Sequence, residues 1–145
     1  CYWVITKKWR DGDKVRIKFT PTIQEVSSVN GEIALQYGAL MCAQPIDAQK
    51  EITKTYPVHG FEDMHLEPIP GAYEELAFPA GSRWKEFGFE PVQLTKNTIP
   101  LRPFDKPVVA LQGKMIRTRD GAEKNVALVP LGNASTLRRL TFPIT

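Results

Sequence analysis

Side chains that could bind a metal lie close together at one place in the sequence. His59 and His65, the two histidines of the chain, flank Glu62 and Asp63. Their spacing matches none of the usual zinc patterns, and a third strong ligand is not evident. The spacing therefore favours a polar loop at residues 59–65, and we expect no cofactor.

The other reactive groups lack the neighbours that catalysis requires. Cys42 lies in an apolar run, without an adjacent histidine or basic helix start to activate its thiol, so we expect a small buried side chain. Together with Cys1 it makes a poor disulfide framework. Acidic residues are frequent between residues 62 and 90, but their spacing selects no pair suited to glycosidic hydrolysis. The residue types alone thus predict no catalytic residue.

Aromatic side chains give the one hint of binding. They gather in the middle of the chain: Tyr56, Tyr73, Phe78, Trp84 and Phe87. Three interpretations are open. The rings cover the edges of the domain as a small core, they anchor a protein interface, or they stack on sugar rings. Trp84, Tyr73, Phe87 and Tyr56 are the candidate contacts for a carbohydrate or a partner protein.

The bulk properties are those of one globular domain. The chain has 145 residues, of which 42% are hydrophobic and 24% charged. A net charge of +3 is too small to indicate a nucleic-acid partner, and no apolar run approaches the length of a membrane span. Basic residues gather near both ends, where we expect them on the solvated faces of strands.

The elements that position these residues are organised around residues 32–46, the longest weakly charged run. Ile33, Leu35 and Tyr37 alternate with small or polar residues, as in a strand with one buried face. Residues 39–43 are apolar throughout, as in a strand covered on both sides. We expect two strand halves joined at a bulge or bend at Gly38, near the centre of a sheet.

Strands are also predicted on either side of this run. Before it, residues 3–10 and 14–20 favour two strands joined by the turn at Asp11 and Gly12, and residues 23–26 continue the second. After it, residues 108–111, 114–119, 125–130 and 136–143 favour strands separated by turns. The pattern predicts an all-β, antiparallel β-sandwich, jelly-roll-like, formed by residues 1–145 as a single domain.

The segment between these two groups differs in character. Residues 47–107 hold eight of the twelve prolines and predict a long irregular excursion that wraps a neighbour. Within it, residues 47–54 could form one or two helical turns, and residues 84–90 favour a strand.

Three motifs in this order resemble one group of enzymes. Residues 6–15 (TKKWRDGDKV) are similar to its entry strand R-x-W-x-x-G-D-x-V, and residues 33–41 (IALQYGALM) to its strand v-A-L-x-R-G-P-L-v. Residues 128–132 (LVPLG), followed by Leu137-Arg138 and residues 141–143, resemble its C-terminal close. The group is the β-L-arabinofuranosidase-type glycoside hydrolases, family 127 and relatives (the former DUF1680 group). Tyr37 and Ala39 depart from its usual Arg and Pro.

The resemblance implies a scaffold rather than a catalyst. In that family these motifs belong to a β-sandwich that follows an (α/α)6 catalytic barrel, and a zinc-bound cysteine nucleophile lies in the barrel. This chain has no paired-cysteine motif to receive that role. It is thus expected to be a non-catalytic C-terminal accessory module of a larger protein, with the parent's catalytic domain as its partner.

Other expectations follow less directly. The family implies a periplasmic or secreted bacterial protein and a plant-type oligosaccharide as a possible further ligand; no nucleic acid and no membrane are expected. An isolated sandwich with an exposed interface face is also expected to pair with a second copy. The alternatives are a carbohydrate-binding module that uses Trp84 and Tyr73, and a free-standing interaction or adhesin-like domain.

Overall fold

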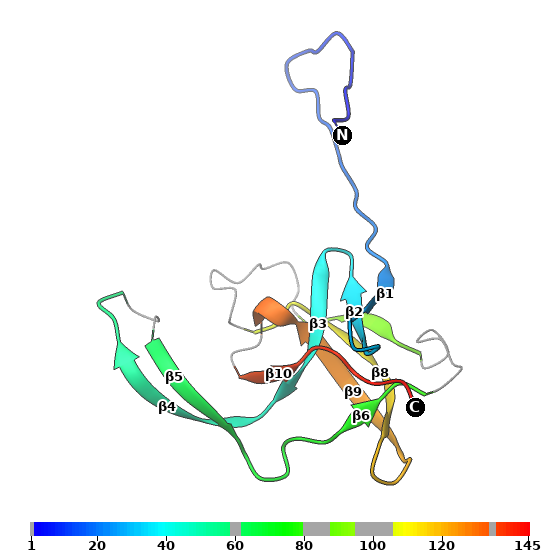
Figure 1. The fold of residues 1–145 in the computed structure, drawn as a ribbon. Helices are drawn as coiled ribbons and strands as arrows, with labels where there is room; N and C mark the ends of the chain where they lie inside the picture. The colour runs from blue at the N-terminus through cyan, green and yellow to red at the C-terminus, as the bar shows by residue number, and fades with distance from the viewer. Residues whose placement is uncertain (1, 59–61, 80–87, 95–105, 134–135) are drawn as a thin grey trace.

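The computed structural model describes residues 2–58, 62–79, 88–94, 106–133 and 136–145. In these ranges the chain is all-β and its strands pair antiparallel, apart from one isolated parallel bridge. One 3₁₀ turn, η2 (Leu131–Asn133), is present, and no α-helix occurs in the described ranges. The predicted all-β, antiparallel fold of sandwich type is therefore confirmed (Figure 1).

Eight strands form the main sheet. Its hydrogen-bonded order is β1-β2-β3-β9-β8-β6, with β10 beside β3 and β7 beside β8. In chain order these are β1 (Ile23–Ser27), β2 (Ile33–Tyr37), β3 (Leu40–Ile46), β6 (Leu76–Ala77), β7 (Glu90–Gln93), β8 (Val109–Arg117), β9 (Glu123–Pro130) and β10 (Leu137–Arg139). The predicted strands between residues 108 and 119 form one strand, β8, and the turn that follows it leads into β9 as expected.

The run at residues 32–46 forms a hairpin rather than two halves of one strand. β2 and β3 pair antiparallel, and Tyr37 lies opposite Leu40. Gly38 has φ +60°, which suits the first residue of a two-residue hairpin turn. The prediction of a bulge or bend was wrong because a positive-φ glycine serves either purpose. Burial on both sides holds for Cys42 and Ala43, whereas Leu40 is exposed.

The strand pairings form a closed circuit, because β6, at one end of the strand order, is connected to β2 through the C-terminal residues. The C-terminal residues close it: Ile33 and Phe142 exchange two backbone hydrogen bonds of 2.9 Å. Two residues further on, Ile144 forms a parallel bridge with Phe78, which directly follows β6. The last five residues therefore connect the two ends of the fold.

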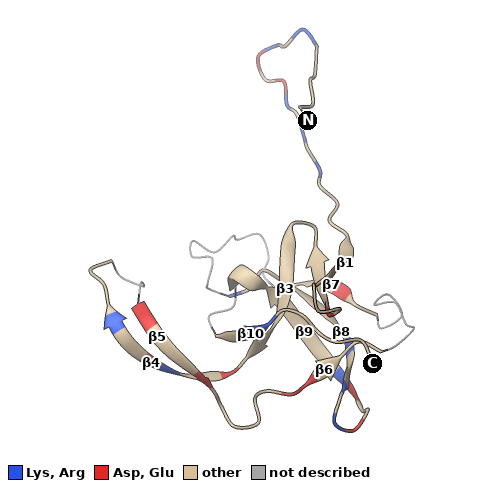
Figure 2. Cartoon of the chain, viewed as in Figure 1, with Lys and Arg blue, Asp and Glu red and all other residues tan. Residues whose placement is uncertain are grey.

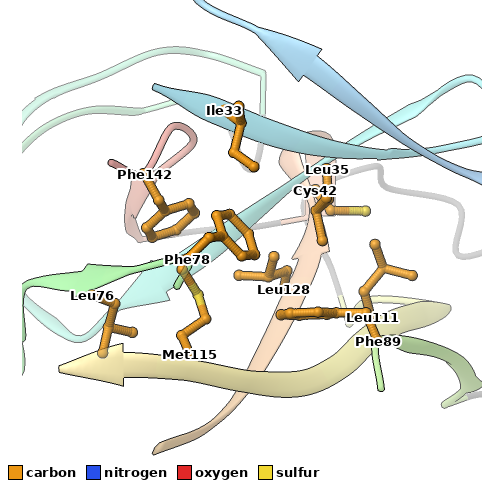
Figure 3. Packing of buried hydrophobic residues seen from close by; sticks show 10 residues of the cluster. All are labelled: Ile33, Leu35, Cys42, Leu76, Phe78, Phe89, Leu111, Met115, Leu128 and Phe142. Atoms are coloured by element: carbon orange, nitrogen blue, oxygen red, sulfur yellow. The ribbon is translucent and has the colours of Figure 1, made fainter. Parts of the chain in front are cut away.

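The core lies inside this circuit. Figure 3 shows the rings of Phe78 and Phe142 next to each other, surrounded by aliphatic side chains. The centroids of these two rings lie 5.9 Å apart in an edge-to-face arrangement, and Phe89 lies 5.8 Å from Phe78 on another side. The buried cluster comprises Ile33, Leu35, Cys42, Leu76, Phe78, Phe89, Leu111, Met115, Leu128 and Phe142.

Part of the middle segment is regular. β4 (Ala48–Thr55) and β5 (Glu62–Pro68) pair with each other as a separate two-stranded sheet. Figure 1 shows this hairpin reaching outward from the body. The predicted helical turns at residues 47–54 are therefore wrong. The predicted strand at residues 84–90 lies mostly outside the described residues, and only Glu90 is seen to enter a strand, β7.

The two N-terminal strands predicted at residues 3–10 and 14–20 are also wrong. Residues 2–22, here called the N-terminal arm, form no strand and extend away from β1 (Figure 1). The predicted turn is present, because the Asp13 N–H donates to the Arg10 carbonyl at 3.1 Å and Gly12 has φ +84°. An alternating pattern becomes a strand only when another strand pairs with it, and no described part of the chain does so.

A substitution at Gly113 tests the packing of the core against β8. A Cβ atom at this position would lie 2.6 Å from the Phe89 ring, which is 5% exposed. We expect Gly113→Ala to lower the free energy of unfolding by about 1–3 kcal/mol through overpacking, measured by chemical denaturation. Gly132→Ala is the matched control, since nothing lies within 4 Å of that position. Equal stability of the two variants would contradict this packing.

Candidate interaction surfaces

The described residues contain no group of three or more His, Cys, Asp or Glu side chains placed to hold a metal ion. His65 lies on β5 and its Nε2 is 3.3 Å from Glu67 Oε1, with both side chains exposed. His59, the other half of the predicted polar loop, lies outside the described residues. The part of this loop that is described, residues 62–65, lies on strand β5 rather than in a loop.

Tyr73 is held by a contact with the C-terminal region. Its hydroxyl accepts a hydrogen bond from Arg139 Nη1, and the guanidinium lies 5.8 Å from the centroid of its ring. Arg139 also lies 5.5 Å from the Phe142 ring, so one cation contacts an exposed and a buried aromatic residue. Tyr73 is 42% exposed, and part of its ring remains open to a ligand or a partner.

Glu32 completes this cluster. Thr141 Oγ1 donates to Glu32 Oε2 at 2.5 Å, and Arg139 Nη2 lies 3.5 Å from Oε1. The Thr141 hydrogen bond is the main cause that lowers the pKa of the Glu32 carboxyl, and Asn30 and Arg139 add to it. Each polar group here is bonded to another part of the fold, so the cluster fastens the C-terminal residues to the start of β2.

Tyr56 belongs to a different region. It follows β4, its hydroxyl donates to Asp63 Oδ2 at 2.7 Å, and Lys54 Nζ lies 4.7 Å from the centroid of its ring. Tyr56 is thus a surface residue of the β4–β5 hairpin, 42% exposed.

The predicted aromatic contacts do not form one described site. Tyr56 and Tyr73 have separate partners, and Phe78 is a core residue with 2% exposure. Trp84 and Phe87 lie outside the described residues. Among the three of these aromatics that the structure describes, Phe78 is the one that belongs to the core.

An open groove of about 630 Å³ lies over β7, β8 and β9. Glu90 is paired with Gln112 across β7 and β8, and Lys114 with Asn125 across β8 and β9. These polar side chains supply hydrogen-bond donors and acceptors, but no aromatic ring occurs among the described residues that line the groove. The groove was not predicted, because it depends on the pairing of β7 with β8, which no local pattern in the sequence shows.

The N-terminal arm carries the largest run of exposed apolar side chains. Trp3 and Phe19 are 79% and 85% exposed, and Tyr2, Val4, Ile5, Trp9, Val15 and Ile17 are exposed as well. Its turn is stabilised by Asp13 Oδ2, which accepts from the Arg10 N–H at 2.8 Å and pairs with Lys7 Nζ at 3.0 Å. Both contacts lower the pKa of Asp13, the Arg10 N–H most. Exposed apolar surface of this kind marks an interaction region.

Comparisons with known proteins assign the chain to no family. No family model, no curated protein and no solved structure matches the chain. In the described ranges, no helix has the length and apolar character needed to cross a membrane.

The Glu32 cluster gives the fold a defined acid response. The pKa of Glu32 is lowered in the folded state from its ordinary value of 4.5. Ionised Glu32 therefore stabilises the fold fully at pH values above 4.5, and this stabilisation is lost as the pH falls through the lowered pKa. We expect Glu32→Gln to have a lower Tm than the parent chain at pH 7, with the difference closing near pH 3. Glu62→Gln, on the exposed strand β5, is the control and should show no such difference. An equal deficit for Glu32→Gln at both pH values would contradict this role.

Burial of Cys42 predicts an unreactive thiol. Desolvation raises its pKa to about 11, and the side chain is 1% exposed. In a Cys1→Ser background at pH 8, about one Cys42 thiol in a thousand is ionised. We expect modification by a disulfide reagent to be at least about 100-fold slower in the folded chain than in denaturant. Similar rates in both conditions would show that this part of the core opens freely.

Proposed function

We propose that this chain is a non-catalytic accessory β-sandwich module of a glycoside hydrolase, which packs on a catalytic barrel of the same parent protein. The observation that carries the proposal is the position of the residues that resemble family 127. Residues 33–41 form the β2–β3 hairpin, and residues 128–132 end β9 beside it. Leu35, Cys42 and Leu128, in or next to these residues, are at most 1% exposed.

The third part of the resemblance supports the same proposal. Residues 141–143 include Phe142, which is fully buried and pairs with Ile33. Side chains that point into a core contribute stability and do not contact a substrate. Two of the three motifs therefore include core residues, which favours a shared scaffold, whereas residues 6–15 lie in the exposed N-terminal arm. In the family the catalytic cysteine lies in the barrel.

Two exposed surfaces also support packing against another protein. The N-terminal arm presents apolar side chains on alternate positions, and the β4–β5 hairpin is exposed along nearly its whole length. Both features favour burial against another protein surface over binding of a small substrate.

The genomic reading frame and an activity assay test the proposal. We expect the frame to encode an (α/α)6 barrel upstream of Cys1, and the purified chain to release no product from aryl arabinosides. Hydrolysis by the chain alone, abolished by Glu32→Gln or by Glu90→Gln, would overturn the proposal. A frame without a barrel would favour a free-standing interaction domain.

A carbohydrate-binding module is the second candidate, favoured by the polar groove over β7, β8 and β9. Calorimetric titration with arabinan-type oligosaccharides separates it from the scaffold. The scaffold proposal predicts no heat at millimolar ligand. Saturable heat that is lost in Gln112→Ala and kept in Gln24→Ala, on strand β1 away from the groove, would support sugar binding instead.

A further inference from the structure

Two segments of this chain have the side-chain pattern of a β-strand and backbone edges to which no described strand is paired. Residues 14–19 of the N-terminal arm alternate between Val15, Ile17, Phe19 and three basic residues, and these apolar side chains are 51%, 61% and 85% exposed. The β4–β5 hairpin is a sheet of two strands, and in the described structure neither of its outer edges pairs with another strand. A two-stranded sheet is marginally stable in water, so it gains from a third strand.

The two faces of the hairpin differ in character. Ile52 lies opposite Met64 and Lys50 opposite Leu66, so Ile52, Met64 and Leu66 share one face. Ile52 and Met64 are 54% and 42% exposed. The other face presents Gln49, Glu51, His65 and Glu67, again in opposite pairs. The hairpin is therefore amphipathic with a period of two, as residues 14–19 are.

The charges of the two segments are complementary. Residues 2–20 hold six basic and two acidic side chains, a net charge of +4. The two hairpin strands hold four acidic residues and two lysines, a net charge of −2. Figure 2 shows basic positions spaced along the arm and acidic positions on β5. A strand from the arm paired with β5 could place Ile17 beside Met64 and Leu66, and its basic side chains beside His65 and Glu67.

Residues 14–19 cannot all pair along the hairpin of their own chain. The arm is fixed at the Gly38 end of the β2–β3 hairpin, where the Gly38 N–H donates to the Thr22 carbonyl at 3.0 Å. β4 begins at the other end of β3, which is about 20 Å away for a strand of this length. Positions 19 and 22 are three residue steps apart, so their Cα atoms lie at most about 11 Å from each other. Figure 1 shows the arm and the hairpin leaving opposite sides of the body.

We propose that residues 14–19 of one copy add as a strand to β5 of a second copy, and that the exchange is reciprocal. Each copy then donates its arm and receives its partner's, which gives a closed dimer with two-fold symmetry. The exchange places Val15, Ile17 and Phe19 beside the apolar side chains of the hairpin, which removes part of their surface from water, and it extends each hairpin to three strands. It requires neither a sugar ligand nor a catalytic barrel, but it covers the same two surfaces that the proposed function assigns to another protein, so it is proposed for the chain by itself.

Light scattering coupled to gel filtration tests the exchange on the full chain. We expect a dimer at about 50 μM that dissociates on dilution. Ile17→Asp, in the arm, and Met64→Asp, in the hairpin, should each weaken dimerisation at least tenfold. Val29→Asp is the matched control, because Val29 is fully exposed in a turn outside both segments, and it should remain dimeric. Slow Cys42 modification verifies that each variant is folded.

Mixing the two defective variants identifies the contact. The Met64→Asp chain keeps an intact arm and the Ile17→Asp chain an intact hairpin, so one of the two exchanges can still form between them. We expect a heterodimer in the mixture at concentrations where either variant alone is monomeric. A monomeric parent chain up to 200 μM, a dimer insensitive to both substitutions, or a mixture that stays monomeric would each overturn the proposal.

Discussion

The pairing of Ile33 with Phe142 is the contact on which the rest of this fold depends. It joins β2 to the C-terminal residues by two hydrogen bonds, and the same residues reach Phe78 beside β6. The ring of Phe142 is fully buried against Phe78, and loss of such a ring typically costs about 3–5 kcal/mol. Backbone pairing and side-chain burial therefore act at one place, where β2 is connected to the region beside β6.

The contacts around this pairing explain why polar side chains cluster near it. Glu32 accepts a hydrogen bond from Thr141. These two residues directly precede Ile33 and Phe142, so the ionic cluster is adjacent in sequence to the paired core residues on both segments. Arg139 extends the cluster to Tyr73. The carboxylate and the guanidinium thus hold the C-terminal residues in register beside β2, which positions Phe142 over the core.

The sequence predicted the elements whose signal is local. β8, β9 and the turn between them follow from apolar runs broken by Asp120 and Gly121, and β2 follows from its two-residue period. The Gly38 hairpin was misread because a positive-φ glycine suits a bulge, a bend or a hairpin turn, and the pairing of Tyr37 with Leu40 that distinguishes them is not visible in the sequence. β4 was missed because charged residues hide its pattern. Tyr73 was predicted as a contact, but its partner Arg139 is 66 positions away and no local signal reveals it.

The distribution of paired and unpaired groups agrees with the proposal that this chain associates with a partner. Several prominent carboxylates are engaged by cations: Arg117 pairs with Glu74 at 3.3 Å and with Asp120 at 2.8 Å, and Arg139 lies against Glu32. The hydrogen bond from Arg117 lowers the pKa of Asp120 and the hydrogen bond from Thr141 lowers that of Glu32, so these two carboxylates stabilise the fold and are weak acid or base catalysts at neutral pH. The apolar side chains of the N-terminal arm, in contrast, lack burial. Removing apolar surface from water lowers the free energy, and the carboxylates named above already have their partners. Covering the apolar side chains of the arm is therefore the strongest driving force for association that this chain offers.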